Sequence, residues 1–541
     1  MTRSITPLLT ALLLGGTAAT TSSATARSAT AFSATTLVAD AAASAEPGES
    51  LVLASTTIVV ADTAAPAEPD EAPVPAATTI DVAASSEAPE ADSPAATSSS
   101  AVPAATDSSA DAFDAPGAFL SLLTRGATDP FATIVEIGNH WTPSLVPMAI
   151  ETLRLDWSSP TRPTLLALLG ERTGERFGGD IDRWWRDVWS RPEVRHPHYA
   201  DFKSRLYRNI DPLFGGYFDD ARATDIRLDE VRWGGVRQDG IPPLRYPAML
   251  TAEAADYLAD GDVVFGIAID GDARAYPKRI LAWHEMFVDT IGGVEIAGVY
   301  CTLCGAVIPY ETNHDGTRHE LGTSGFLYRS NKLMYDRATQ SLWSTTRGEP
   351  VIGPLVGEGI ALARRAVVTT TWGEWRRRHP DTTVLDIDTG HRRDYGEGVA
   401  YRDYFATDEL MFTVPSLDER LDNKAEILAL RTTTANADDA ETLAIHADFL
   451  ATRPVHHDTL GGERIVVLTD TSGANRAYRA DDVTFASYDG GARATDAEGG
   501  TWTLDEGAVT GENGTRLERL PAHRAFWFGW VAVHADTRLV R

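Results

Sequence analysis

Cys301 and Cys304 are the only two cysteines in this chain of 541 residues. They are separated by two residues in the segment GVYCTLCGAVIPYE, which covers 298–311. Two thiols at this spacing can bind a metal ion, cycle between dithiol and disulfide, or form a structural cross-link. A disulfide between them would close a very small ring, which restricts the unfolded chain much less than a long loop does. The sequence therefore favours a chemical role for the pair over a purely structural one.

The context of the cysteines favours a metal knuckle over a thioredoxin-type site. In thioredoxin-type proteins the first cysteine lies at the N-terminus of a helix, which lowers its pKa. Here the segments 292–300 and 305–312 predict strands on either side of the cysteines, and Pro309 would break a helix. A tight turn between two strands, followed by Gly305 with its tolerance of positive φ, is typical of a metal knuckle. We therefore expect metal binding, with a redox dithiol and an inert pair as the alternatives.

The other metal ligands must come from elsewhere in the chain or from a second subunit. His284, in the segment WHE, is the best candidate, and Glu285 could be a ligand, a partner of the imidazole or a general base. Met334 would favour copper, because a thioether beside two thiolates and an imidazole suits that ion, whereas Cys301, Cys304 and His284 with water resemble an open zinc site. His284 and Met334 could instead be framework residues. In the redox alternative, Cys301 is the attacking thiolate and His284 or Glu285 is the base.

A dense polar run follows the cysteines and predicts one wall of a pocket that could bind a cofactor. We select Ser324, Tyr328 and Asn331 as the candidate cofactor-binding residues. The run lacks the spacing of a phosphate-binding loop. The segment GTSG around Ser324 also lacks the G-x-S-x-G pattern of a hydrolase nucleophile elbow, so a hydrolase is disfavoured.

Residues 1–26 predict a secretory signal peptide. Arg3 supplies a positive charge, ITPLLTALLLGGTAAT an apolar core, and Ala24–Ala26 a small-residue cleavage site. The apolar core is too short to be a membrane span, and no cysteine follows it that could carry a lipid. Residues 27–112 are rich in Ala, Ser, Thr and Pro and predict a disordered tether. We therefore expect a periplasmic or secreted protein with no integral membrane span after cleavage of the signal.

The charge of the chain limits its partners. The formal net charge is −29 at pH 7, which argues against nucleic acid and anionic lipid as partners. A small-molecule or redox partner remains compatible with this charge, and the sequence does not identify it.

The pattern along the chain predicts an α+β protein with an N-terminal helical domain and a mainly-β domain. From 113 to 224, apolar residues recur at helical spacing between Pro, Gly and Ser breaks, as in PSLVPMAIETLRL and DIDRWWRDVWSR. After Asp225, short β-type runs alternate with Gly-rich turns, as in the hairpin DVVFGIAIDGDARAYP. The three tryptophans of the second helical segment are expected to pack in a core.

The β-rich part contains an internal repeat, from which we predict two duplicated units, 225–402 and 403–541. The segment DTIGGVEIAGVY is echoed by DTLGGERIVVLT, LWSTTRGEPVIG by TWTLDEGAVTG, and the lead-in 264–281 by 411–428. The same spacing also relates Trp372, Trp375, His379 and Thr382 to Trp527, Trp530, His534 and Thr537. Alignment on the first echo places Cys301 opposite Asp470 and Cys304 opposite Gly473. The second unit thus lacks the cysteines, and it has TRP in place of WHE.

Several of these segments together carry a family pattern. Trp-His-Glu, Cys-x-Leu-Cys-Gly, Ser-Asn-x-x-Met-Tyr-Asp and Ser-Leu-Trp-Ser fall on 283–285, 301–305, 330–336 and 341–344. They resemble the bacterial domain-of-unknown-function family numbered 3179, clearly over about 225–400 and more loosely beyond. One departure is Thr302, where proline is common in the family and in metal knuckles. The resemblance supports the site, but the name of the family assigns no reaction.

Overall fold

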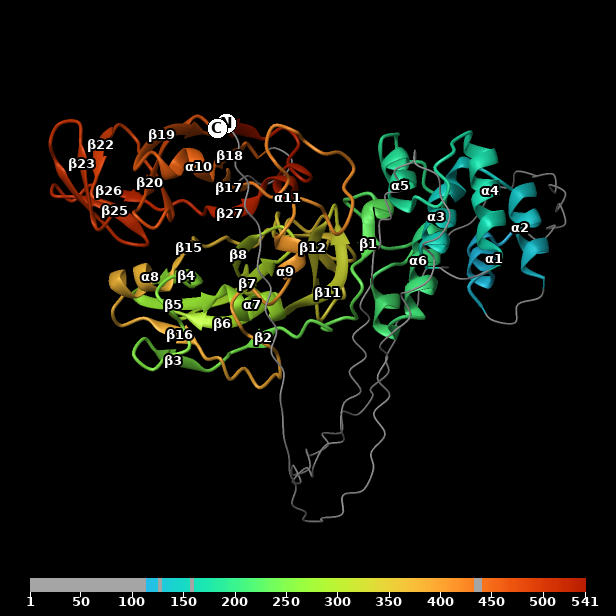
Figure 1. The fold of residues 1–541 in the computed structure, drawn as a ribbon, viewed down its shortest axis with the longest axis horizontal. Coiled ribbons are helices and arrows are strands. Elements are labelled where there is room, and N and C mark those ends of the chain that lie inside the picture. The colour runs from blue at the N-terminus through green and yellow to red at the C-terminus, as the bar shows by residue number, and fades with distance from the viewer. Residues whose placement is uncertain (1–112, 125–128, 156–159, 433–439) are drawn as a thin grey trace, which may run out of the picture. The chain divides into compact units, whose positions relative to one another are not determined.

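The computed structural model describes residues 113–124, 129–155, 160–432 and 440–541 (Figure 1). The predicted signal peptide and tether, 1–26 and 27–112, lie outside the described residues. Helices and several β-sheets are both present, which confirms the α+β class. Among the described residues, no helix is both long and apolar enough to cross a membrane.

The N-terminal part of the described chain is helical, and Figure 1 draws it in blue to green. Its α-helices are α1 (Ala115–Ser121), α2 (Pro130–Asn139), α3 (Val146–Leu155), α4 (Arg162–Thr173), α5 (Ile181–Trp189) and α6 (Tyr199–Arg208). The Asp180 side chain caps α5 by accepting a hydrogen bond from the Arg183 amide (2.9 Å). Trp184, Trp185 and Trp189 of α5 are all buried in the core, as predicted.

Two sheets of the β-rich part have the same strand order and directions. The first is ordered β15-β4-β5-β16-β3 and the second β27-β17-β18-β28. In each, three strands run antiparallel and the next is parallel: β16 to β5, and β28 to β18. The strands are β3 (Met249–Thr251), β4 (Val263–Ile269), β5 (Asp272–Pro277), β15 (Val368–Thr371), β16 (Thr383–Leu385), β17 (Glu426–Arg431), β18 (Thr442–His446), β27 (His523–Phe526) and β28 (Arg538–Val540).

Two further sheets each contain three consecutive antiparallel strands, and the first of them also has a parallel pair, β2 with β6. They are ordered β2-β6-β7-β8 and β19-β20-β21. Their strands are β2 (Leu244–Arg245), β6 (Met286–Ile291), β7 (Val294–Cys301), β8 (Ala306–Glu311), β19 (Val455–Leu460), β20 (Glu463–Thr469) and β21 (Asn475–Arg479). The cysteines lie at the turn from β7 to β8, and Asp470 and Gly473 lie at the turn from β20 to β21.

The remaining strands form two antiparallel meanders, β1-β11-β12-β13-β14 and β22-β23-β24-β25-β26, and a small hairpin, β9-β10. They are β1 (Val231–Trp233), β9 (Asn313–His314), β10 (Thr317–Arg318), β11 (Leu321–Tyr328), β12 (Asn331–Asp336), β13 (Leu342–Ser344), β14 (Glu349–Ile352), β22 (Phe485–Tyr488), β23 (Arg493–Asp496), β24 (Thr501–Leu504), β25 (Ala508–Gly511) and β26 (Arg516–Glu518). Short helices lie between strands of the β-rich part: α7 (Lys278–His284), α8 (Trp372–Arg378), α9 (Arg402–Phe405), α10 (Ala447–Ala451) and α11 (Trp527–Val531).

The repeated tryptophans hold equivalent positions in the two strand–helix units β15–α8 and β27–α11. The indole N–H of Trp375 donates to the Thr382 hydroxyl at 2.9 Å, and that of Trp530 donates to the Thr537 hydroxyl at 2.9 Å. Both tryptophans are fully buried. Each threonine thus supplies the hydrogen-bond acceptor that a buried indole N–H needs, so these repeated residues have a structural role.

Candidate functional site

Cys301 and Cys304 form a disulfide across the turn from β7 to β8, with their Cα atoms 5.3 Å apart. The Cys304 amide donates to the Cys301 carbonyl (3.1 Å), which closes the turn. Gly305 follows with a φ of 62°, in the left-handed region that favours glycine. The turn between two strands and the positive φ of Gly305 both agree with the sequence prediction.

Both cysteines are buried: Cys301 is 2% exposed and Cys304 is 1% exposed. Cys301 is the last residue of a strand, so it does not itself lie at the N-terminus of a helix, as the first cysteine of a thioredoxin-type site does. The Cys304 sulfur lies 3.5 Å from the Ser330 carbonyl oxygen, a direction in which a reduced thiol could donate a hydrogen bond. Between the cysteines, the buried Thr302 hydroxyl has no hydrogen-bond partner among the described residues.

One wall of the site is the segment β27–α11. The Phe526 amide donates to the Cys304 carbonyl at 2.7 Å. A Cβ atom on Gly529 would lie only 2.9 Å from the Cβ of Cys304, so no larger residue fits there without movement. The Asn331 side-chain amide donates to the Gly529 carbonyl (2.8 Å) and ties this wall to β12.

The other wall carries a buried ion pair between Glu285 and Lys332. The Glu285 Oε2 and Lys332 Nζ atoms are 3.0 Å apart, and the two side chains are 11% and 6% exposed. Lys332 also donates to the Glu285 carbonyl (3.2 Å), and the Tyr401 hydroxyl donates to Glu285 Oε1 (3.0 Å). The Tyr300 amide donates to that same Glu285 carbonyl (2.9 Å), so the pair lies against the residue that precedes Cys301. Burial lowers the pKa of Lys332, although the Glu285 carboxylate raises it in part.

Glu285 is held in an unusual backbone conformation. It follows the last residue of α7 with a φ of 55°, in the left-handed region that few non-glycine residues adopt. Such conformations cost free energy and often mark functional positions. The carboxylate of the WHE segment is thus fixed in place by both its backbone and its partners.

Lys332 and Tyr401 are site residues that sequence reasoning missed. The available signal for Lys332 was a lysine inside NKLMYD, a strand in which every residue is buried. A buried lysine requires a partner, so this position could have been selected if the strand had been predicted to be buried on both faces. Tyr401 gave no such signal, because its contact with Glu285 spans 116 residues of sequence.

His284 has both ring nitrogens occupied. Its Nδ1 atom is 2.9 Å from the Pro242 carbonyl oxygen and its Nε2 atom is 2.6 Å from the Tyr395 hydroxyl. These partners fit a neutral ring that donates from Nδ1 and accepts at Nε2. Burial lowers the pKa of His284 to about 4, which keeps the ring neutral. In this arrangement His284 has no free nitrogen for an ion held by the cysteines.

Met334 is not brought to the cysteines. It is fully buried on β12, in a core cluster with Trp343 and Leu321, whereas the cysteines belong to a different cluster. Among the described residues, no group of three or more His, Cys, Asp or Glu side chains is arranged to hold a metal ion. The predicted ligand set of Cys301, Cys304, His284 and Met334 therefore does not come together here, and metal binding stays a prediction.

The three candidate cofactor-binding residues lie on β11 and β12. The Ser324 hydroxyl donates to the Leu333 carbonyl (2.6 Å) and accepts from the Phe326 amide (3.0 Å). The Asn331 side-chain amide donates to the Gly529 carbonyl. Tyr328 is largely buried, and this burial raises the pKa of its hydroxyl. The polar atoms of Ser324 and Asn331 thus support the backbone beside the cysteines, and cofactor binding stays a prediction.

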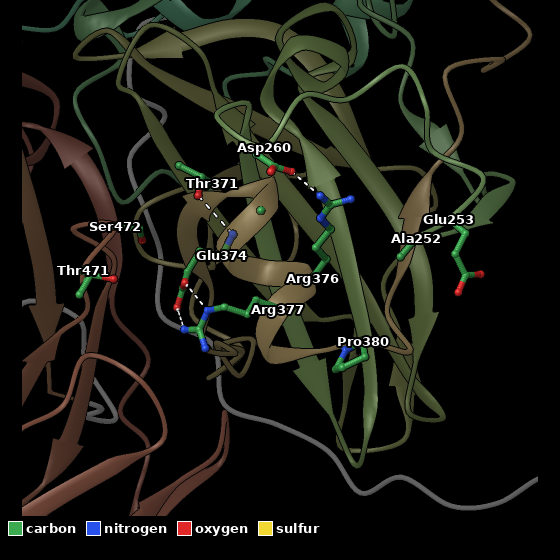
Figure 2. Close-up of a pocket in the computed structure, with 11 residues that line it drawn as sticks. Ala252, Glu253, Asp260, Thr371, Glu374, Arg376, Arg377, Pro380, Thr471 and Ser472 are labelled. Atoms are coloured by element: carbon green, nitrogen blue, oxygen red, sulfur yellow. Dashed lines mark hydrogen bonds and ion pairs between the residues drawn. The ribbon is translucent and has the colours of Figure 1, made fainter.

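A shallow depression of about 760 Å³ lies beside α8, apart from the cysteines (Figure 2). Its arginines are already paired: Arg376 with Asp260, and Arg377 with Glu374. Ser472, in the turn from β20 to β21, lies at its edge. Because the arginines are exposed and partnered, we assign no binding role to this depression.

Comparison with known proteins gives one match. The family model described as "Protein of unknown function (DUF3179)" matches residues 238–537, which include the disulfide, the Glu285–Lys332 pair and both strand–helix units. No curated protein matches the chain, and no solved structure matches it either.

Proposed function

Because the chain belongs to the DUF3179 family, whose description assigns no activity, we propose a function from the site itself: a thiol–disulfide oxidoreductase that acts outside the cytoplasm. The reacting bond is the disulfide between Cys301 and Cys304. An extracytoplasmic location rests on the predicted signal peptide, 1–26, and suits a protein whose cysteines are oxidised.

The observation that carries this proposal is the buried Glu285–Lys332 pair, which is joined to Tyr300, the residue before Cys301, through the Glu285 carbonyl. Buried ion pairs pay a desolvation penalty that often cancels their attraction, so they are weak stabilisers of a fold. Their value at a disulfide is chemical, because an ammonium group can protonate or stabilise a leaving thiolate and a carboxylate can accept the proton back. The small ring of the disulfide adds little to stability in comparison.

The proposed reaction consumes an external dithiol. A thiolate of the dithiol attacks the Cys301 sulfur, the disulfide breaks, and its electron pair leaves on the Cys304 sulfur, which then takes up a proton. The second thiol of the dithiol attacks the mixed disulfide, loses its proton and releases Cys301 as a thiol. The protein gains two electrons and two protons, and the external dithiol becomes a disulfide. In the reverse direction, the Cys301 thiolate attacks a substrate disulfide.

Access to the sulfurs requires movement. With exposures of 2% and 1%, neither sulfur can meet a thiolate in line with the bond while the turn is packed on Phe526 and Gly529. Exchange therefore needs the turn 301–305 to separate from the β27–α11 wall. We infer that the rate of opening of this contact limits the rate of exchange.

We also propose that the β-rich part consists of two duplicated units that follow an N-terminal helical domain, 113–224. The identical strand orders β15-β4-β5-β16 and β27-β17-β18-β28 support the duplication. This equivalence matches β4–β5 with β17–β18, so it starts the second unit near Glu426 rather than at 403 and does not support the alignment of 264–281 with 411–428. The disulfide and the Glu285–Lys332 pair then belong to the first unit alone.

Metal binding by the reduced pair is the second candidate function. It is favoured by the knuckle-like turn, in which the Cys304 amide donates to the Cys301 carbonyl and Gly305 is left-handed. Copper or zinc would be held by the two thiolates, and further ligands would come from His284 or Met334 after rearrangement, or from a second subunit. Elemental analysis of the full chain, purified under anaerobic conditions, decides between the candidates. One equivalent of metal that is lost in both Cys301→Ser and His284→Ala would replace the redox proposal.

The redox proposal is tested by equilibrating the folded chain with dithiothreitol buffers of graded potential and counting thiols. We expect two thiols to appear in one transition without loss of the native circular dichroism spectrum. Lys332→Met and Glu285→Gln should each slow exchange roughly tenfold or more, while Ser472→Ala, in the counterpart turn from β20 to β21, should exchange like the parent. A pair that is reduced only after unfolding, or variants that all exchange at the parent rate, would refute the proposal.

A further inference from the structure

A second buried polar cluster, away from the disulfide, consists of two guanidinium groups and two imidazoles. Its members are Arg364, Arg431, His523 and His534. Five of their nitrogens are inaccessible to solvent and have no hydrogen-bond partner among the described residues: Arg364 Nη1, Arg431 Nε and Nη1, His523 Nε2 and His534 Nε2. His523 is 4% exposed and the Arg431 side chain is 8% exposed. Buried polar groups without a partner are rare and require an explanation.

The members of this cluster are positioned together by the sheet and by a tryptophan. The register of β17 and β27 pairs Ala429 with His523 and so places Arg431, two residues further along β17, on the same face as His523. Arg364 Nη2 donates to the Arg431 carbonyl (3.1 Å). His523 and His534 both contact the ring of Trp530, with ring centroids 5.7 and 4.1 Å away.

Among the described residues, the only carboxylate that forms an ion pair with either guanidinium group of the cluster is that of Glu349. Glu349 Oε1 is 3.8 Å from Arg431 Nη2, and the same carboxylate also pairs with Arg347 (3.3 Å). Burial, with the charge of Arg431, lowers the pKa of Arg364 to about 10. Burial and the nearby guanidinium groups lower the pKa values of His523 and His534 to about 3, so both imidazoles are neutral. A buried guanidinium group is costly without an anion beside it.

The other half of the β-rich part contains a matching cluster that has its own anion. Isolated bridges pair Tyr310 with Arg364 in one half and Tyr478 with Arg519 in the other. There, Glu506 forms ion pairs with Arg519 and with Arg476, both at 2.8 Å. Its carboxylate also lies 3.5 Å from His379, the counterpart of His534.

In the first cluster, no carboxylate occupies the sequence position that corresponds to Glu506. When Trp343 and Gly348 of LWSTTRG are aligned with Trp502 and Gly507 of TWTLDEG, Arg347 takes the position of Glu506. The chain therefore supplies an acid to one cluster and a further base to the other.

We propose that Arg364, Arg431, His523 and His534 form a binding site for one small oxyanion. Its oxygens accept hydrogen bonds from the guanidinium groups and balance their charge, as the Glu506 carboxylate does in the matching cluster. The two guanidinium groups supply charged donors, and the neutral imidazoles supply Nε2–H groups. Nonspecific attraction does not explain such an anion, because the net charge of the chain is −29. The site is independent of the proposed redox function.

The test measures the melting temperature of the full chain, freed of oxyanions, as phosphate, sulfate or formate replaces chloride at constant ionic strength. We expect a saturable rise with at least one of them, and the three arms separate an inorganic oxyanion from a carboxylate. Arg431→Gln and Arg364→Gln should each raise the apparent dissociation constant about tenfold or more. The control Arg516→Gln, on an arginine side chain that is 48% exposed, should respond like the parent.

Three outcomes would overturn the proposal: no rise above the chloride reference, an equal rise in every variant, or a rise that does not saturate. A second measurement does not depend on the variants folding. A crystal structure of the unmodified chain grown with the most stabilising anion should contain that anion within hydrogen-bond distance of Arg364 and Arg431. Water alone at that place would refute the site.

Discussion

Glu285 Oε2 lies 3.0 Å from Lys332 Nζ, and both side chains are buried. This contact joins two segments that are 47 residues apart, WHE and SNKLMYD. The carboxylate also accepts from Tyr401, and the Glu285 carbonyl accepts from the Tyr300 amide, so the pair is connected to the strand that ends at Cys301. A charged pair in this setting is expected to influence stability and sulfur chemistry together.

Removal of one partner of this pair should destabilise the fold strongly. Lys332→Met leaves the Glu285 carboxylate buried and unpaired, for which we expect a loss of about 3–5 kcal/mol in the free energy of unfolding. The double variant Lys332→Met with Glu285→Gln should lose much less, because no unpaired charge remains. Urea unfolding of the parent, of each single variant and of the double variant measures these differences in the free energy of unfolding. Additive losses in the double variant would contradict the coupling.

Stability should fall as the pH is lowered through the range in which a free histidine titrates. Burial lowers the pKa of His284 to about 4 from an ordinary value of 6.5. The unfolded chain therefore binds a proton that the folded chain does not, and the contribution of His284 is complete above pH 6.5 and is lost progressively toward pH 4. The difference corresponds to about 3 kcal/mol. Urea unfolding at pH 7 and pH 4.5 should show that the free energy of unfolding falls less between these pH values for His284→Gln than for the parent. An equal fall in both proteins would contradict the contribution of His284.

Gly529→Ala should disturb the contact between α11 and the disulfide. Its Cβ atom would come within 2.9 Å of the Cys304 Cβ atom, so either the turn or the helix must move. We expect a loss of about 1–3 kcal/mol and faster reaction of the disulfide with dithiothreitol, because the wall over the sulfurs is loosened. Gly261→Ala is a suitable control, since a Cβ atom there meets no atom within 4 Å. If Gly529→Ala is as stable as Gly261→Ala and its disulfide reacts as slowly with dithiothreitol, the β27–α11 wall does not protect the disulfide.

The disulfide itself should contribute little to stability. The chain-entropy relation gives about 2 kcal/mol for so small a ring. Cys301→Ser with Cys304→Ser should therefore remain folded, with a free energy of unfolding lower by about that amount. Calorimetry on the oxidised, reduced and doubly substituted proteins provides the comparison. A loss of more than about 4 kcal/mol in the double variant would favour a structural role for the pair.

The local structure around the cysteines could be predicted from the sequence. Strands on both sides, a tight turn and a positive φ at Gly305 follow from short-range patterns, because alternation, turn residues and glycine act within a few positions. The α5 helix and its buried tryptophans were predicted for the same reason. The sequence alignment also sets Cys301 opposite Asp470; Cys301 is the last residue of β7, and Asp470 directly follows β20.

Tertiary structure alone decided the partners of the chemically interesting side chains. His284 was predicted to face the cysteines, but its nitrogens contact Pro242 and Tyr395, which are 42 and 111 residues away. Lys332 and Glu285 likewise come from segments that are 47 residues apart in the sequence. Hydrogen bonds between distant segments depend on how sheets and helices pack, which no local pattern encodes. Composition and spacing thus determined which residues could do chemistry in this protein, and packing determined which of them meet.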